Sequence, residues 1–470
     1  MGARAGIVGM EVRGLNLGRN LGLRGHALSF HAPQNKEGEY LDTPHSITRY
    51  PELHQSKSYP DVKSFVESLS TPRIIFSMVP VGKATDDVIL QLIPFLTDGD
   101  VLIDGSNAHY DDTTRRCGEL DGKGIHFIGC GFSGGLDAIT NGPSIMPGGS
   151  KAGYEIVSTL LGEMAATAMD GSPCCTYVGP QGAGHFAKIV HNGIEYAEMQ
   201  LLAEVYSLMR WGVGLTPDHI AEVMSQWKES DASSYLIDIT LKILRQKEDD
   251  HWVINTILDS AGHRGTGVWA VQAAASFGIP AMMITAALHA RYLSGQRHIR
   301  VHLDEVTRSQ QRKNPSLSTT DLFNAYQLGR IINYHEGYSI IRAVSKEYDW
   351  NINLSDLSRI WTNGCVIRSS MMNRFVALWE TWDDELVLHP DIKSTIASAW
   401  SGLRRINHVA SSETVFTPCL VAASQYIAGA SLRFPTANLI QAQRDFFGSH
   451  GYWKIGDNSN HLHHFPWNRE

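Results

Sequence analysis

The first 130 residues alternate between short apolar runs and longer stretches with apolar residues at helical spacing, and this alternation restricts the fold more than any other feature. The runs at 5–8, 27–31, 73–79, 101–104 and 125–128 are predicted strands. Repeated strand and helix units predict a parallel, doubly wound sheet of the Rossmann type. Such sheets bind ligands at the carboxyl ends of their strands, so the residues that follow each strand are candidates for a site.

A glycine-rich turn joins the first predicted strand to a helix predicted over 12–23. Gly9 and Gly14 frame this turn and Val12 lies between them, while Val79 ends the third predicted strand. Glycines in such a turn let the backbone approach a pyrophosphate at the amino end of a helix, which is typical of dinucleotide-binding units. These four residues are therefore candidate cofactor-binding residues.

One residue of the turn departs from that pattern. Glu11 occupies a position where the pattern requires a small residue, and its carboxylate would crowd and repel a pyrophosphate. Arg13, two residues later, is a candidate to offset this charge, either by pairing with Glu11 or by reaching the phosphates.

Polar groups follow two further strands. Asn107 comes after the strand 101–104, and Ser133, Gly134 and Gly135 come after the strand 125–128. A hydroxyl with unhindered backbone N–H groups suits a carboxylate or a phosphate. The glycine-dense segment 129–149 would equally suit a surface loop without a ligand.

The segment QGAGHFAKIVHNGIEYAEMQ is predicted to form a helix with a narrow polar stripe. Four polar residues share one helical face with Lys188: His191, Asn192, Glu195 and Tyr196. A base, an acid and three orienting groups in one array suit proton transfer on a bound substrate. An ordinary amphipathic helix with a solvated face would show the same pattern.

After residue 181 the helical patterns become long and the strand signals few, which predicts a mostly α second domain. We expect a dinucleotide-binding domain at 1–180, a helical substrate and dimerisation domain at 181–436, and a tail at 437–470. The turn SAGHRGTG carries Arg264 and Thr266, and a helix predicted over 279–293 carries Arg291.

Composition narrows the classes of partner. The net charge is −8 and no block of basic residues occurs, which argues against nucleic acid or an anionic membrane as the main partner. No apolar run has the length of a membrane span, and the first ten residues have too short an apolar core for a signal peptide. Six scattered cysteines do not form a disulfide framework, so we expect a reducing, cytoplasmic compartment.

The tail carries a group of histidines that could suggest a metal. His461, His463 and His464 lie close together, but their spacing matches no second group of ligands, so no metal site is predicted.

Six motifs together resemble the 6-phosphogluconate dehydrogenase family, the decarboxylating enzymes of the pentose phosphate pathway. They are DGSNAHYDDTTRR, GFSGGLDAITNGPSIMPGG, GAGHFAKIVHNGIEYAEMQ, DSAGHRGTG, GCVIRS and ANLIQAQRDFFGSH, and they extend over nearly the full length. The resemblance implies a Rossmann-like domain, a large all-α domain and a homodimer in which the tail of each subunit reaches its partner. It also implies oxidative decarboxylation of 6-phosphogluconate, or a close phosphorylated sugar acid, with hydride transfer to a nicotinamide dinucleotide.

The resemblance assigns roles to residues that match the family motifs. Lys188 matches the base that takes the 3-hydroxyl proton, and Glu195 matches the acid that protonates the enediol. His191 and Asn192 match residues that orient the substrate. The family residues around the substrate carboxylate and the nicotinamide of the cofactor correspond here to Asn107, Ser133, Gly134 and Gly135. The family residues that bind the substrate phosphate correspond here to Tyr196, Arg264, Thr266 and Arg291, together with Arg444 and His450, which reach in from the other subunit.

Several residues depart from the family pattern. Arg264 replaces a lysine and keeps its charge. In the cofactor half, Ala32-Pro33-Gln34 replaces an Asn-Arg-Thr whose arginine holds the 2′-phosphate of NADP, and Pro80 replaces a lysine. We therefore expect NADP to bind weakly or with altered specificity, with NAD as an alternative cofactor.

Three hypotheses follow. The first is a working oxidative decarboxylase. The second is a specialised paralogue that uses the Lys188 and Glu195 array for decarboxylation, isomerisation or elimination with weak or no dinucleotide binding. The third is a non-catalytic sensor of sugar phosphates, which would have no evident need for both residues.

Overall fold

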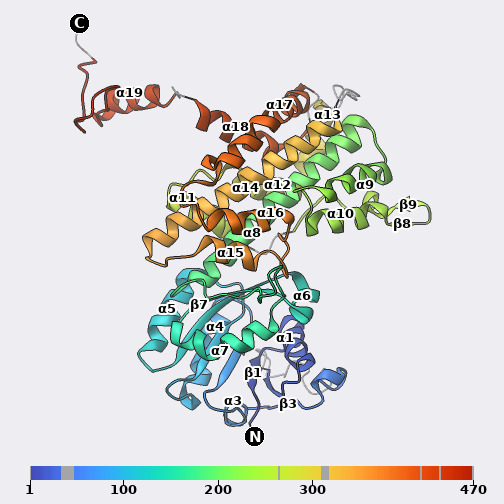
Figure 1. Cartoon of the computed structure of the whole chain (residues 1–470), viewed down its shortest axis with the longest axis vertical. Helices are drawn as coiled ribbons and strands as arrows, with labels where there is room; N and C mark the ends of the chain where they lie inside the picture. The colour runs from blue at the N-terminus through green and yellow to red at the C-terminus, as the bar shows by residue number, and fades with distance from the viewer. Residues whose placement is uncertain are drawn as a thin grey trace.

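The computed structural model shows a sheet-containing part, a helical part stacked on it, and a tail that extends away from the helices (Figure 1). The structure describes residues 2–32, 47–262, 265–307, 317–412, 415–432 and 436–467. Among these residues, no helix is long and apolar enough to cross a membrane.

A seven-stranded sheet organises the first part. Its strands are β1 (Ala5–Val8), β2 (Leu28–His31), β3 (Lys57–Ser58), β4 (Ile74–Ser77), β5 (Val101–Asp104), β6 (His126–Ser133) and β7 (Ser144–Gly149). Their order is β3-β2-β1-β4-β5-β6-β7, and all pairs are parallel except β6 with β7. This is the predicted Rossmann-type arrangement, with an antiparallel strand added at one edge.

Helices cover both faces of this sheet. They are α1 (Val12–Leu23), α3 (Val62–Glu67), α4 (Lys83–Leu92), α5 (Tyr110–Asp121), α6 (Gly135–Asn141) and α7 (Lys151–Met164). Ile7 belongs to the core on one face and Val8 to the core on the other. Because both faces are buried, β1, β4 and β5 are mostly apolar rather than alternating, which made them recognisable in the sequence.

The glycine-dense segment 129–149 differs from the sequence prediction. The strand predicted over 125–128 continues to Ser133, and residues 144–149 form β7 beside it, with Gly131 opposite Met146 and Ser133 opposite Ser144. Both strands are almost wholly buried. The segment is therefore part of the sheet, and the interpretation as a surface loop is wrong for most of it.

The second part is helical apart from a short hairpin of β8 (Lys247–Glu248) and β9 (His251–Trp252). Its helices are α8 (Ala183–Ser207), α9 (Pro217–Gln226), α10 (Tyr235–Arg245), α11 (Thr266–Ser276), α12 (Met282–Gly295), α13 (Arg297–Thr307), α14 (Thr319–Glu347), α15 (Leu354–Ile360), α16 (Ser370–Trp379), α17 (Pro390–Ser412) and α18 (Pro418–Ser431). The central pair is α8 and α14, which pack on each other and are mostly buried.

A buried ion pair joins these two central helices. Arg330 on α14 lies 3.0 Å from the carboxylate of Glu198 on α8, and neither side chain is exposed. The hydroxyl of Tyr334 donates a hydrogen bond to the same carboxylate at 2.9 Å. The buried carboxylate therefore has a cationic partner and a hydrogen-bond donor within the core, and both come from α14.

Glycines let α8 approach the sheet as closely as two backbones can. A Cβ atom on Gly184 would lie 2.4 Å from the carbonyl oxygen of Gly129 and 2.5 Å from the amide of Gly148. A Cβ atom on Gly131 would lie 2.5 Å from the Cβ of Lys188. The amino-terminal half of α8 is therefore seated directly on β6 and β7.

The tail consists of α19 (Ala437–Gly448) and an irregular stretch that folds back on it. The carboxylate of Asp445 accepts hydrogen bonds from the amides of Gly451 and Phe465 and from the indole of Trp467. His463 and His464 bond to Asp457 and Asp445. Within the described parts of the chain, no group of three or more acidic, histidine or cysteine side chains could hold a metal ion.

The contact between α8 and the sheet gives a direct test. We expect Gly184→Ala to lower the free energy of unfolding by about 1–3 kcal/mol or more, because its Cβ meets rigid backbone on two strands. Gly118→Ala on α5, where the Cβ enters open space, should leave the thermal midpoint unchanged or raise it. Equal midpoints for the two variants, measured by circular dichroism, would contradict the inferred packing.

Candidate active site

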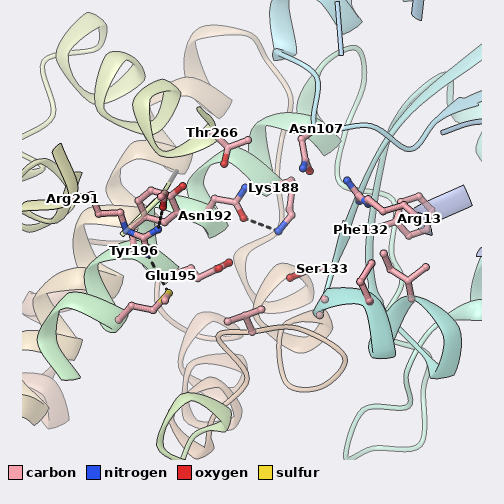
Figure 2. A pocket seen from close by; sticks show the side chains of 17 residues that line it. Arg13, Asn107, Phe132, Ser133, Lys188, Asn192, Glu195, Tyr196, Thr266 and Arg291 are labelled. Carbon is pink, nitrogen blue, oxygen red and sulfur yellow. Dashed lines mark hydrogen bonds between the residues drawn. The ribbon is translucent and has the colours of Figure 1, made fainter. Parts of the chain in front are cut away.

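A cavity of about 700 Å³ lies where the two parts of the molecule meet (Figure 2). The sheet-containing part contributes four of the predicted site residues to its wall: Asn107, Ser133, Gly134 and Gly135. The helical part contributes six: Lys188, Asn192, Glu195, Tyr196, Thr266 and Arg291. The structure thus brings together residues that are up to 184 positions apart in the chain.

Lys188 lies at the centre of this cavity and is buried. Its Nζ donates a hydrogen bond to Oδ1 of Asn192 at 2.6 Å and lies 3.4 Å from Nδ1 of His191. The pKa of Lys188 is lowered to about 8, mainly by burial; the charge of Glu195 opposes this shift and the charge of Arg13 adds to it. A substantial fraction of Lys188 is therefore neutral near pH 7–8, as a general base requires.

His191 supports this lysine from behind and does not itself line the cavity. Its Nε2 lies 3.0 Å from the hydroxyl of Ser133, and its ring is wholly buried. Burial and the charge of Lys188 hold the pKa of His191 well below its usual value. A neutral imidazole with Nδ1 facing Lys188 and Nε2 facing Ser133 links the base to the turn of Ser133.

Glu195 lies one to two helical turns beyond Lys188 and faces the cavity from a half-buried position. Burial raises the pKa of Glu195, and the charges of Lys188 and Arg291 partly oppose this shift. A carboxyl group with a raised pKa can carry a proton near neutral pH and act as a general acid. The array therefore holds a weakened base and a weakened acid in one cavity.

Arg291 forms one end of the cavity. Its guanidinium stacks on the ring of Tyr196 at 3.6 Å, and its Nη1 donates to the carbonyl of Gly262 at 3.2 Å. Thr266 begins α11 next to them, and a Cβ atom on Gly267 would lie 2.7 Å from the Tyr196 ring. This glycine lets α11 reach Tyr196, so that a hydroxyl and a guanidinium face the same space.

Three residues of the predicted phosphate set are not placed in this cavity. Arg264 lies outside the described residues. Arg444 and His450 are exposed on α19 and just after it, and α19 lies far from the junction of the two parts of the chain in Figure 1. Within one chain, neither residue lines the described cavity.

The glycine turn after β1 has the geometry that a dinucleotide requires. Gly9 has a φ of +95°, and a Cβ atom on Gly14 would lie 1.9 Å from the carbonyl oxygen of Gly9. Val79 borders the same turn and Val12 is exposed beside it. Glu11 makes no side-chain hydrogen bond to the start of α1, so it leaves the amino end of the helix uncapped. The residues present fit a pyrophosphate at this turn.

The structure describes some of the residues that differ from the family pattern in the cofactor-binding half of the chain. Ala32 is buried directly after β2. Pro33 and Gln34 lie outside the described residues.

The sequence did not assign several residues that line the cavity: Arg13, Phe132, Leu136, Ile139, Met199, Gly262 and Val366. For two of these residues, the sequence contains a pattern that indicates a place near the site. Met199 follows Glu195 by four residues and so shares its helical face, and Phe132 precedes Ser133. The sequence indicates Arg13 only as a partner for Glu11 or the phosphates, and its place in this cavity emerges only from the packing of α1.

The fold and the cavity define a class of protein: an oxidoreductase in which a dinucleotide-binding domain shares its cavity with a helical domain. Comparisons with known proteins agree. Residues 4–179 match the family model of the NAD binding domain of 6-phosphogluconate dehydrogenase, and residues 184–467 match that of the 6-phosphogluconate dehydrogenase C-terminal domain. The chain belongs to the 6-phosphogluconate dehydrogenase family.

Individual relatives extend over nearly the whole chain. The decarboxylating 6-phosphogluconate dehydrogenase of Escherichia coli K12 is 40% identical over 458 residues, which is 96% of both chains. That of Klebsiella pneumoniae is 39% identical over 454 residues, covering 95% of this chain and 96% of the relative. A Plasmodium falciparum 6-phosphogluconate dehydrogenase, solved in its apo form and in complexes with NADP+ and with 6-phosphogluconate, superposes with a TM-score of 0.92 at 32% identity. That match covers 99% of this chain and 100% of the other.

The pKa of Lys188 predicts the pH dependence of turnover. Because the base must be neutral, kcat/KM should rise with pH and level off above an apparent pKa of about 8. Glu195→Gln removes the charge that raises the pKa of Lys188, so the rising limb should move to lower pH. The same variant loses the acid and should be about 10²- to 10⁴-fold slower.

Steady-state rates between pH 5.5 and 9.5 measure both effects. If the rising part of the pH profile lies at the same pH in the variant as in the unmodified protein, the charge of Glu195 does not affect the pKa of Lys188.

Proposed function

We propose that this protein oxidatively decarboxylates 6-phosphogluconate, giving a pentulose phosphate and CO₂ and passing a hydride to a nicotinamide dinucleotide. Membership of the family supports this reaction rather than a cofactor-independent one or a sensor role. The observation that carries the proposal for this chain is the buried array of Lys188, Asn192 and Glu195, which lies between the arginine end of the cavity and the sheet-containing part.

The array suits the proton transfers of such a reaction. Neutral Lys188 accepts the proton of the substrate 3-hydroxyl as the hydride leaves, and Asn192 holds its Nζ in position. Lys188 then returns a proton to the developing oxygen as CO₂ departs. Glu195, whose pKa is raised by burial, supplies the proton that the resulting enediol takes up on carbon. Lys188 takes back the hydroxyl proton that is released as the enediol becomes a ketone. When bound, the dinucleotide supplies the hydride acceptor.

We assign the two ends of the substrate to two parts of the cavity. The phosphate lies at the Arg291, Tyr196 and Thr266 end, where a stacked guanidinium and a hydroxyl converge. The carboxylate lies at the end of Ser133, Gly134 and Gly135, close to Asn107. Gly134 and Gly135 have φ values of +112° and +77°, and a Cβ on Gly135 would meet open space. Arg264 is assigned to the phosphate by its motif.

We further propose a cytoplasmic homodimer that works in the pentose phosphate pathway. The domains would be 1–180, 181–436 and a tail at 437–470 that reaches the partner subunit. The exposure of apolar residues on the tail supports this arrangement, since Phe447 is 73% and Ile455 is 93% exposed in one chain. Arg444 and His450 would complete the phosphate end of the partner's cavity.

A hybrid dimer tests the exchange of tails. Arg444→Ala and Lys188→Met should each be nearly inactive as pure proteins. Co-expressed, they should regain about a quarter of the unmodified rate, because random pairing makes half of the dimers hybrid and each hybrid has one intact site. Lys188→Met co-expressed with the unmodified chain is the control for dimer exchange.

If Arg444 acted within its own chain, no hybrid would contain an intact site. A mixture that stays inactive after hybrid formation is shown by differential tagging would therefore contradict the exchange.

We propose that both NADP and NAD bind weakly and with little discrimination. The carboxylate of Glu11 is exposed at the turn that fits the pyrophosphate, and Pro33 stands where the family places an arginine. Glu11→Ala should tighten both cofactors. Pro33→Arg should tighten NADP selectively, by about 10- to 100-fold, the value of a charge-assisted contact.

Calorimetric titration of each variant with both cofactors measures these changes. Asp121→Ala removes an exposed acid at the far end of α5 and should change neither affinity. Tight, NADP-selective binding by the unmodified protein would contradict the proposal.

A further inference from the structure

Arg13 forms the end of the cavity opposite Arg291. In Figure 2 the two arginines lie on opposite sides of the view, with Lys188 and Glu195 between them. Arg13 is half-buried and comes from the first turn of α1. It lines the same cavity as Ser133.

The packing of α1 directs this side chain. Asn16 and Asn20 follow Arg13 by three and seven residues and so lie on the same helical face. Asn16 Nδ2 donates to the carbonyl of Leu136 at 3.4 Å, and Asn20 Nδ2 donates to that of Ile139 at 2.8 Å. Both acceptors belong to α6, which follows Ser133 directly in the chain. The face that carries Arg13 is therefore held against the segment that includes the Ser133 turn.

The charge balance of the cavity calls for an anionic ligand with two charged ends. Two arginines, Arg13 and Arg291, line the described wall together with Lys188, whereas Glu195 is the one acid among the lining residues that the structure describes. Glu195 is influenced by the charges of Lys188 and Arg291. A ligand that carries a phosphate at one end and a carboxylate at the other matches this distribution.

We propose that Arg13 is a specificity-determining residue that binds the substrate carboxylate through charge-assisted hydrogen bonds, beside Ser133 and opposite the phosphate. This inference rests on the proposed function and adds a residue to it. A guanidinium presents a planar pair of donors that matches the two carboxylate oxygens. Arg13 thereby selects sugar acids over sugar phosphates that carry an alcohol or an aldehyde at this end.

The same contact affects the chemical step. When CO₂ leaves, the bond from the carboxylate carbon to its neighbour breaks and the electron pair remains on the sugar chain. The negative charge therefore moves away from the group that Arg13 holds. An interaction that is stronger in the ground state than in the transition state tightens binding without accelerating the reaction. Arg13 thus lowers KM and does not raise kcat.

Calorimetry with two ligands tests the assignment on the full-length protein. The ligands are 6-phosphogluconate and glucitol 6-phosphate, which has an alcohol in place of the carboxylate. Arg13→Met should bind 6-phosphogluconate about 10- to 100-fold more weakly and glucitol 6-phosphate almost unchanged. Arg13→Lys keeps the charge without the planar donors and should show an intermediate loss. Arg4→Met, an exposed arginine before β1, is the control.

Kinetics gives an independent readout. For Arg13→Met, KM should rise while kcat stays equal or increases. The rising limb of kcat/KM should also move to higher pH, because a positive charge near Lys188 is lost. The other groups that influence Lys188 remain in place: His191 and Glu195 on α8, and Cys365 before α16.

Three results would overturn the inference. An equal loss of affinity for both sugar phosphates would assign Arg13 a purely structural role. Unchanged 6-phosphogluconate affinity with weaker NADP or NAD binding would assign it to the dinucleotide phosphates. An unmodified protein that binds no 6-phosphogluconate would contradict the proposed function itself, and the inference with it, whereas the first two results leave that function intact.

Discussion

The groups that α8 places in the cavity depend on how closely this helix approaches β6 and β7. Glycines at 129, 131, 148 and 184 remove the side chains that would separate helix from sheet, so Lys188 lies directly over Gly131. The rest of α8 is held in the helical domain by the buried pair of Glu198 and Arg330. One helix is thus fixed at one end to the sheet and at the other to the helical core, and it spans the junction that forms the cavity.

Burial at this junction shifts the two ionisable groups of α8 in opposite directions. A lysine removed from water loses affinity for its proton, and a carboxylate gains it, so the pKa values of Lys188 and Glu195 move toward each other. Their mutual attraction limits both shifts. His191 is kept neutral by the same burial and therefore adds no charge to this balance. The pKa shifts of these three residues therefore follow from the burial of one helix, α8, against the glycines of β6 and β7.

Local patterns in the sequence predicted most of the fold. The strands 5–8 and 101–104 and the helix 12–23 agree with the structure to the residue. Their signals are short-range: an apolar run, or apolar residues at helical spacing. The segment 129–149 was harder, because its glycines resemble those of a loop. Gly129, Gly131 and Gly148 are in fact in contact with α8, at residues that lie 36 or more positions further along the chain.

The sequence by itself determined the family, most of the strands and helices, and the residues of the polar stripe on α8, since these depend on residue identity and local spacing. Only the tertiary structure decided which of these residues share a cavity, how deeply each is buried and where Arg13 points. Burial sets the pKa of Lys188, and it arises from contacts between segments that are far apart in the chain. Residue spacing carries no information about such contacts, because a folded chain brings distant segments together through packing.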